Sequence, residues 1–380
     1  MLLCLAACTA CNRAPVVTVQ GGDVRGIKEG NVLVYKGIPF AAPPLGQLRG
    51  KDPSEVIPWK GVLECDKFAP AAVQAPFPHY VVPYYKEFYS DGDPEFSEDC
   101  LYLNVWTPAC APKEGRSDLP VAVWIHGGSL DHGYSYEKEM DGAAWARRGV
   151  ILVTIAYRLG EIGFPPDGSL LGFKDQIAAL RWVKNNISSF GGDPSRVTVF
   201  GQSAGAISVK YILADSEGRS LVSGAILQSG GGISPMDIGL PEGTRGETLR
   251  QALEDGAFDG IPVMAGFTAQ DPDILGRPAT LEIADALSAR EGARVYVYEF
   301  ARDLPGESPS EEDPGAFHSA ELWYMFGTLP RCWRPFTEAD YRLSGKMLEQ
   351  WTSFAKCSDP GYPAYSGGAK HIERLDVEPS

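Results

Sequence analysis

Ser203 stands at the centre of the stretch VFGQSAGA, residues 199–206, which has the spacing Gly-x-Ser-x-Gly. A strand-like run precedes it and a helix-like run follows, the context in which this motif lifts a serine hydroxyl above a sheet edge. Gly201 and Gly205 leave room for a strained turn, and the N-terminus of the following helix favours developing negative charge. The alternative, a glycine-rich turn with an idle serine, fits this context less well. The motif therefore predicts a nucleophilic Ser203.

A serine hydroxyl is a weak nucleophile at neutral pH until a base removes its proton. Histidine is the usual base, and the chain has five. His318 lies in GAFHSAELWYMF, in a loop before an apolar segment. His79, His132 and His371 stand in irregular stretches without a recognisable partner, and His126 precedes a glycine pair. His318 is therefore the predicted base.

A carboxylate that orients the base is expected between the serine and the histidine. The stretch AGFTAQDPDIL, residues 265–275, follows an apolar strand and holds Asp271 and Asp273 on either side of Pro272. From these residues alone, either aspartate could do chemistry, or both could belong to an ordinary polar turn.

The tetrahedral intermediate of acyl transfer needs hydrogen-bond donors for its oxyanion. The stretch IHGGSL, residues 125–130, ends a predicted strand and offers the backbone N–H groups of Gly127, Gly128 and Ser129. The N–H of Ala204, directly after the nucleophile, would complete the oxyanion hole.

Strand-like and helix-like segments alternate through the middle of the chain, which indicates a mostly parallel sheet with crossover helices. The apolar runs at residues 119–125 and 149–157 lack polar alternation, as expected for strands covered on both faces. Near the N-terminus, VVTVQGGDVRGI and NVLVYKGIPF are typical of antiparallel strands joined by glycine turns. Further strands are expected at RVTVF, GAILQ, IPVMAGF and RVYVYEF, and helices at DQIAALRWVKNNI and AGAISVKYILA.

A long C-terminal helix is expected over TEADYRLSGKMLEQWTSFAK. Thr337 and Asp340 resemble a capping box at its start. The apolar side chains predicted to be buried on one side of this helix are Tyr341, Met347, Leu348, Trp351 and Phe354.

Composition excludes several classes of function. A net charge of −15 argues against a nucleic-acid partner, because such proteins need a basic face. No apolar run reaches the roughly 18 residues that a membrane-spanning helix needs. HExxH is absent and CxxC occurs only in the N-terminal tail, so the sequence does not predict a zinc site. The chain is long enough for a large core, and α/β enzymes of this size are often one domain.

Residues 1–15, MLLCLAACTACNRAP, are apolar and rich in small residues. LAAC, which ends at Cys8, resembles a bacterial lipobox, although the apolar run before it is short and no basic residue precedes it. The segment is either the remnant of a lipoprotein signal or a tail without structure. The first interpretation predicts export (periplasmic, lipid-anchored or extracellular) with membrane contact only through Cys8, and a cytoplasmic location is the alternative. Residues 16–380 are expected to form a single domain.

Three longer strings carry a resemblance to a known family. YKGIPFAAPPLGQLR, SEDCLYLNVWTP and FGGDPSRVTVFGQSAGA resemble signatures of the type B carboxylesterase and cholinesterase family, and the resemblance extends from about residue 16 to residue 360. It implies an α/β-hydrolase fold, with a central, mostly parallel, twisted sheet flanked by helices. It also implies a serine carboxylesterase that works through an acyl-enzyme, acts on a small-molecule ester and needs no cofactor.

The family places its acid five residues after the glycine that ends the strand, which at Gly266 selects Asp271 over Asp273, although the family usually has Glu there. By this resemblance the catalytic residues are Ser203, Asp271 and His318, the oxyanion donors are Gly128, Ser129 and Ala204, and the residues supporting them are Gln202 and Ser229. Independently of the resemblance, the aromatic side chains of FPHYVVPYYKEFYSDGDPEF either form a buried local cluster or line the mouth of a pocket. The second interpretation places Tyr84 and Tyr85, together with Leu130, in the substrate pocket.

The resemblance also implies two buried ion pairs, Arg49 with Glu98 and Arg158 with Asp175. The half-cystine that usually pairs with Cys100 is missing near Val73, so either Cys65 replaces it or Cys100 is free. The family's last oxyanion glycine is replaced by Ser129, which implies a differently shaped hole.

The chain is short for the family before Asp175 and before Ile261. These short segments imply a reduced cap and a more open site, or a deletion that compromises the fold. Short acyl or hydroxycinnamoyl esters are the expected substrates. A non-catalytic binding or adhesion relative is the alternative function, which the presence of both Ser203 and His318 disfavours.

Overall fold

The computed structural model describes residues 12–77, 85–111, 117–233, 246–306, 315–366, 368 and 370–377. The strands are β1 (Arg13–Val19), β2 (Gly22–Glu29), β3 (Val32–Pro39), β4 (Val62–Glu64), β5 (Ala71–Ala72), β6 (Phe96–Ser97), β7 (Tyr102–Pro108), β8 (Leu119–Ile125), β9 (Ile151–Ile155), β10 (Gly192–Gln202), β11 (Gly224–Gln228), β12 (Val263–Thr268), β13 (Val295–Phe300) and β14 (Glu373–Leu375).

The helices connect these strands. They are α2 (Ala143–Arg147), α3 (Gly160–Gly163), α4 (Leu171–Asn186), α5 (Ala204–Ala214), α6 (Ser216–Ser220), α7 (Gly246–Glu254), α8 (Arg277–Ser288), α9 (Leu322–Phe326) and α10 (Glu338–Cys357), with short 3₁₀ turns η1 (Gly46–Leu48), η4 (Ile187–Phe190) and η5 (Leu329–Arg331) and a π-helical turn η2 (Tyr85–Tyr89).

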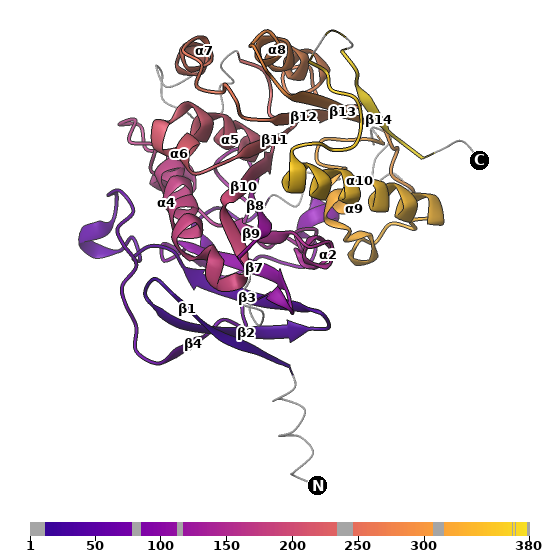
Figure 1. Cartoon of the computed structure of the whole chain (residues 1–380). Helices are drawn as coiled ribbons and strands as arrows, with labels where there is room; N and C mark the ends of the chain where they lie inside the picture. Colours follow the sequence, from indigo (N-terminus) through magenta and orange to yellow (C-terminus); the bar gives the residue numbers. More distant parts are fainter. Residues whose placement is uncertain are drawn as a thin grey trace.

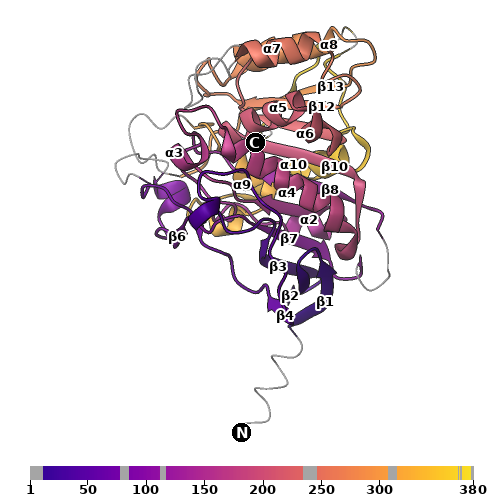
Figure 2. The ribbon, with the colours of Figure 1, turned by 90° about the vertical axis from the view of Figure 1, so that its left-hand side faces the viewer.

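One large sheet organises the molecule, in the order β1-β2-β3-β7-β9-β8-β10-β11-β12-β13-β14, with β4 paired to β2 (Figure 1). The pairs from β1 to β9 along this order are antiparallel, and those from β9 to β14 are parallel. The N-terminal strands and the helices α7 and α8 lie at opposite ends of the molecule (Figure 2). This arrangement is the predicted α/β-hydrolase fold.

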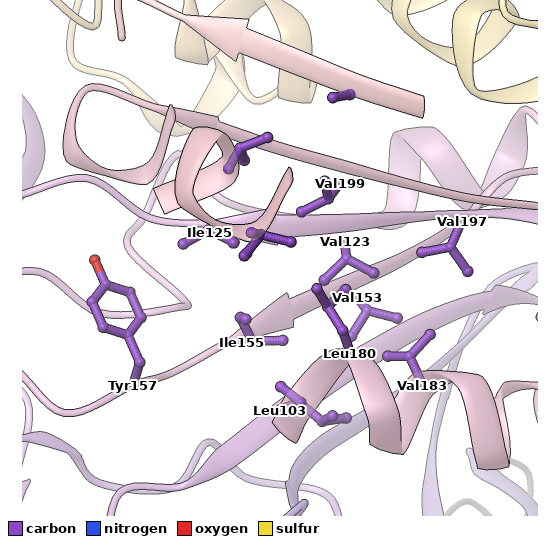
Figure 3. Close-up of a cluster of buried hydrophobic side chains, with 14 of the residues drawn as sticks. Leu103, Val123, Ile125, Val153, Ile155, Tyr157, Leu180, Val183, Val197 and Val199 are labelled. Carbon is purple, nitrogen blue, oxygen red and sulfur yellow. The ribbon is translucent and has the colours of Figure 1, made fainter. Parts of the chain in front are cut away.

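Both faces of the sheet are covered, as the unbroken apolar runs predict. In β8, Val121 and Val123 belong to one buried cluster, which α4, α5 and α8 complete. Ala122 and Trp124 point to the other face and join the cluster that α2, α9 and α10 complete. Figure 3 shows the first cluster, in which Leu180 and Val183 of α4 lie on the valines and isoleucines of the central strands.

Four connecting segments leave the sheet side by side at the carboxyl ends of neighbouring strands. Ile125 of β8 pairs with Gly201 of β10, Gln202 of β10 pairs with Gln228 of β11, and Gln228 pairs with Gly266 of β12. Ligand sites of parallel α/β sheets form at this edge. The segments after these four strands carry the predicted oxyanion loop, Ser203, Ser229 and Asp271.

The C-terminal helix α10 begins at the predicted capping box, in which Asp340 accepts hydrogen bonds from the backbone N–H and the hydroxyl of Thr337. Its buried side includes Met347, Trp351 and Phe354, as predicted. The prediction that Tyr341 is buried is wrong, because its side chain is 49% exposed. Tyr341 lies in the first turn, beside the buried stripe of the helix.

Of the two predicted buried ion pairs, only one is buried. Arg158 and Asp175 are 1% and 0% exposed, and the Arg158 guanidinium donates two hydrogen bonds of 2.7 Å to the carboxylate. Arg49 and Glu98 are paired at 2.7 Å, but Arg49 is 63% exposed. The second pair therefore lies on the surface, where screening by water makes it worth little.

Cys65 and Cys100 are both buried free thiols, so Cys65 does not replace the missing half-cystine. Among the described helices, none has the length and apolar character needed to cross a membrane.

Candidate active site

Ser203 sits on a strained turn between β10 and α5, with φ of 56° and ψ of −125°. A side chain at Gly201 would overlap the backbone of Gly205, and one at Gly205 would overlap the carbonyl oxygen of Ile125. Both glycines are therefore required where strand, turn and helix pass closest to one another. The backbone N–H of Ser203 donates to the carbonyl of Gln228 (2.8 Å), which fixes the turn to the next strand.

The segment after β8 runs directly beside this turn. A Cβ atom placed on Gly127 would come within 3.3 Å of the Ser203 Cβ. Gly128 has φ of 98° and Ser129 has φ of 55°, so Ser129 adopts a left-handed conformation that costs a non-glycine residue energy. Within the described part of the chain, the N–H groups of Gly128, Ser129 and Ala204 have no hydrogen-bond acceptor.

His318 and Asp271 are joined by a 2.5 Å hydrogen bond between the imidazole Nδ1 and the carboxylate Oδ1. The other oxygen of Asp271 accepts hydrogen bonds from the Ser229 hydroxyl (2.6 Å) and from the Thr268 N–H (2.8 Å). The Asp271 side chain is fully buried. The turn after β12 thus brings the Asp271 carboxylate within hydrogen-bond distance of His318, although aspartate is one methylene shorter than the glutamate usual in the family. Asp273, in contrast, is exposed.

Gln202 directly precedes the predicted nucleophile in the chain and contacts the predicted base. Its side-chain Nε2 is 3.1 Å from His318 Nε2, the ring nitrogen that does not contact Asp271. Gln202 is 3% exposed. An uncharged amide at this position contacts the imidazole without adding a charge beside it.

Glu321 is a residue of the site that the sequence did not reveal. It is completely buried, and its Oε1 accepts a hydrogen bond from Gln228 (3.2 Å). Burial, together with the negative charge of Asp271, raises its pKa to about 7. It lies only three residues after His318, but Ser319 between them has φ of 77°, so no helical periodicity links the two positions and only the fold reveals the buried carboxyl group.

A cavity of about 460 Å³ opens over these groups. Ser203, His318, Gly128 and Ser129 line it together, so the structure brings the predicted nucleophile, base and oxyanion loop to one space. The other described residues of its lining include Phe77, Phe88, Tyr89, His132, Met140, Pro272, Leu275 and Leu322.

The three residues predicted for the substrate pocket lie elsewhere or outside the described residues. Leu130 is 2% exposed and belongs to the hydrophobic core. Tyr85 packs against the core cluster of the α10 face and is not part of the cavity lining. Tyr84 lies outside the described residues. Aromatic side chains do line the cavity, but they are Phe77, Phe88 and Tyr89.

Two buried carboxylates, Glu137 and Glu139, also border the cavity. Glu137 accepts hydrogen bonds from the Tyr134 N–H (3.0 Å) and the Tyr89 hydroxyl (3.2 Å). Burial raises the pKa of both, and the proximity of Glu137 raises that of Glu139 further. No lysine or arginine is among the described residues of the lining, so within that part of the chain neither side chain offers a positive charge to an anionic group.

Two of the other histidines have partners that the sequence did not indicate. His132 contacts Asp131, and His371 lies 3.3 Å from Glu373. His126 is buried, and burial lowers its pKa to about 4, so it stays neutral. His79 lies outside the described residues.

Comparison with known proteins identifies the family to which the sequence of this chain is similar. A sequence model of the Carboxylesterase family matches residues 13–256 and 272–376. The matched ranges leave out residues 257–271, which include Asp271. The prediction that Asp271 is the acid is therefore supported by its hydrogen bond to His318 and not by the family match.

Individual proteins similar to this chain are also esterases. The chain is 31% identical to para-nitrobenzyl esterase of Bacillus subtilis over 95% of its own length and 94% of that protein. It is 41% identical to acetylcholinesterase of Bungarus fasciatus, over 65% of this chain and 42% of that protein. A solved structure of a PNB esterase superposes with a TM-score of 0.80 and 29% identity over 95% of each chain.

The first alignment spans 474 positions, more than the 380 residues of this chain, so the relative has insertions that this chain lacks. The shortened segments inferred from the sequence are consistent with that difference. On the family match, the extended similarity and the shared fold, the chain belongs to the carboxylesterase family and hydrolyses carboxylic esters.

Proposed function

We propose that Ser203, His318 and Asp271 form the catalytic triad of a serine carboxylesterase. The observation that carries the proposal is the hydrogen bond between the buried Asp271 carboxylate and His318, which lines the same cavity as Ser203. Asp271 holds the imidazole in one orientation and stabilises its charged form, which is the role of the acid in such triads.

In the proposed reaction, His318 takes the proton of the Ser203 hydroxyl as the oxygen attacks the ester carbonyl. The N–H groups of Gly128, Ser129 and Ala204 stabilise the oxyanion that forms, since no other described group uses them. The imidazolium then gives its proton to the leaving alcohol, and an acyl group remains on Ser203. Water attacks this acyl-enzyme with His318 again as base, and the carboxylic acid is released.

Replacing the nucleophile tests this proposal. The Ser203→Ala variant should fold like the wild type but lose hydrolysis of p-nitrophenyl butyrate by at least about a thousandfold. Circular dichroism and thermal unfolding serve as the control for folding. Undiminished turnover by the variant would refute Ser203 as nucleophile, and an inactive wild type would favour the non-catalytic alternative.

The cavity supports neutral esters with short acyl or aryl groups, including hydroxycinnamoyl esters, as substrates. Its apolar and aromatic lining suits such groups, and the described lining has two carboxyl groups and no lysine or arginine to pair with an anionic one. A panel of acetate, butyrate, decanoate, hydroxycinnamate and monosuccinate esters tests this assignment. The acetate and butyrate esters should react faster than the decanoate and much faster than the monosuccinate. Hydroxycinnamate rates far below the acetate rate would contradict the proposal that aryl esters are substrates.

We also propose that the protein is exported and anchored by a lipid on Cys8, which lies outside the described residues. Support comes from the LAAC sequence alone. Expression of the full chain in a bacterium, with metabolic labelling by a fatty acid, should label the wild type and not the Cys8→Ser variant. Equal labelling, or recovery of all the protein in the cytoplasm, would contradict the proposal.

A further inference from the structure

Lys210 is a buried cation in the helix that carries the nucleophile, and the reaction described above does not use it. It lies seven residues after Ser203, two turns along α5, and is 3% exposed. Burying an ammonium group is costly unless hydrogen bonds replace the lost water. The Lys210 Nζ donates to the carbonyl oxygens of Gly230 (2.7 Å), Gly231 (3.3 Å) and Gly232 (2.7 Å).

The segment that supplies these carbonyls fits closely around the helix. A Cβ atom on Gly230 would come within 2.6 Å of the Ala206 Cβ on α5, and one on Gly232 would overlap the Glu282 carboxylate. Gly231 has φ of 70°. The glycines therefore let the segment pass between α5 and α8 with three carbonyls turned to one point, where an ammonium group has three donors.

A carboxylate of α8 also helps to hold the glycine segment that contacts Lys210. The Glu282 carboxylate of α8 accepts a hydrogen bond from the Ile233 N–H (3.0 Å), directly after the three glycines. Desolvation lowers the pKa of Lys210 to about 7, while the charge of Glu282 acts in the opposite direction. The fold thus buries an ammonium group where, among the described residues, no other donor is seen for these three carbonyl oxygens.

The same segment begins at Ser229, which contacts the acid of the site. Ser229 has φ of 49°, its N–H donates to the Gly266 carbonyl (2.7 Å), and its hydroxyl donates to Asp271 Oδ2 (2.6 Å). A non-glycine residue keeps such a backbone conformation only where its surroundings enforce it. The hydrogen bonds of Lys210 start at the very next residue.

We propose that Lys210 is a positioning residue: its ammonium fixes residues 230–232, so that Ser229 holds Asp271 in the orientation that His318 requires. The inference rests on the proposed catalytic roles of Asp271 and His318. Lys210 acts through Ser229 and contacts neither the substrate nor the reacting atoms.

Kinetics of a double-mutant cycle test the proposal. Lys210→Met should lower kcat for p-nitrophenyl butyrate by roughly 10- to 100-fold, because small displacements of a catalytic group are costly, and should change KM by less than about threefold. In a Ser229→Ala background, the same substitution should change kcat by no more than about twofold, because the hydrogen bond from Ser229 to Asp271, through which Lys210 acts, is already absent.

Controls separate this role from a general loss of stability. Ile212→Val, at a buried position of the same helix, should lower the melting temperature and leave kcat unchanged. If Lys210→Met does not fold, Lys210→Gln keeps an amide donor and should show a smaller loss with the same dependence on Ser229.

A wild-type kcat in either Lys210 variant would overturn the proposal, and so would losses that multiply in the double variant. Ser203→Ala distinguishes this failure from failure of the proposed function. If that variant is inactive while Lys210→Met is fully active, only the role of Lys210 is refuted.

Discussion

At the scale of single residues, backbone strain gathers at the site. Eight non-glycine residues of the described chain have positive φ, and five of them are Ser129, Leu130, Ser203, Ser229 and Ser319. Each lies in or next to a segment that lines the cavity or holds Asp271. Conformations of this kind cost about 1–3 kcal/mol each and persist where the surrounding structure enforces them. The strained residues therefore cluster in the same region as the hydrogen bonds that join Asp271 to His318 and Ser229.

The two aspartates of the turn after β12 should differ sharply in their effect on catalysis. Asp271→Asn should lower kcat about a thousandfold or more, because the amide cannot stabilise the charged imidazole. Asp273→Asn, at an exposed position two residues away, is the matched control and should retain wild-type kcat. Steady-state hydrolysis of p-nitrophenyl butyrate measures both. The reverse pattern would show that the acid has been misassigned.

Glu321 should make stability depend on pH. Its pKa in the folded protein is about 7, above the ordinary value of 4.5, so its contribution to stability is complete below pH 4.5 and is lost as the pH rises through 7. Relative to Glu321→Gln, the wild type should therefore lose on the order of 3 kcal/mol of unfolding free energy between pH 4.5 and 7.5. Urea unfolding at several pH values measures this, and parallel curves for the two proteins would contradict the assignment.

At the scale of elements, motifs with a fixed local geometry were predictable from the sequence. The turn at Ser203 and the capping box at Thr337 each depend on residues close together in the chain. Tyr341 was not predictable in the same way, because its exposure depends on which elements pack against the first turn of α10. The Asp271–His318 hydrogen bond spans 47 residues of chain, so spacing alone could nominate the pair and only the fold brings it together.

The start of α10 gives a second pH prediction. Burial raises the pKa of Asp340, but hydrogen bonds from Arg302, Thr337 and Tyr324 outweigh burial and lower it to about 2. Its contribution is therefore present above pH 3.8, the ordinary value, and is lost as the pH falls through 2.

Asp340→Asn should accordingly lower the unfolding free energy at pH 7 by on the order of 2 kcal/mol. Glu338→Gln, in the same helical turn but 97% exposed, is the control and should change it by less than about 0.5 kcal/mol. Urea unfolding measures both variants, and equal losses would contradict a specific role for the cap.

At the scale of the whole molecule, the shortened chain keeps the overall fold of a PNB esterase. The sheet runs from β1 to β14, and the superposition on a PNB esterase covers 95% of both chains. The deletion that the sequence suggested has therefore not removed the strands that position the site. Which aromatic side chains line the cavity could not be predicted, because the sequence near Phe77 and around Phe88 and Tyr89 of the π-helical turn η2 has no periodic pattern that separates buried from lining positions.

Covalent labelling tests the central claim most directly. The wild-type protein should react with a fluorophosphonate, and peptide mass spectrometry should place one phosphonyl group on Ser203. The Ser203→Ala variant should remain unlabelled under the same conditions, and Asp271→Asn should be labelled much more slowly. A phosphonyl group on another residue, or equal labelling of the Ser203→Ala variant, would contradict the claim that Ser203 is the activated nucleophile of this site.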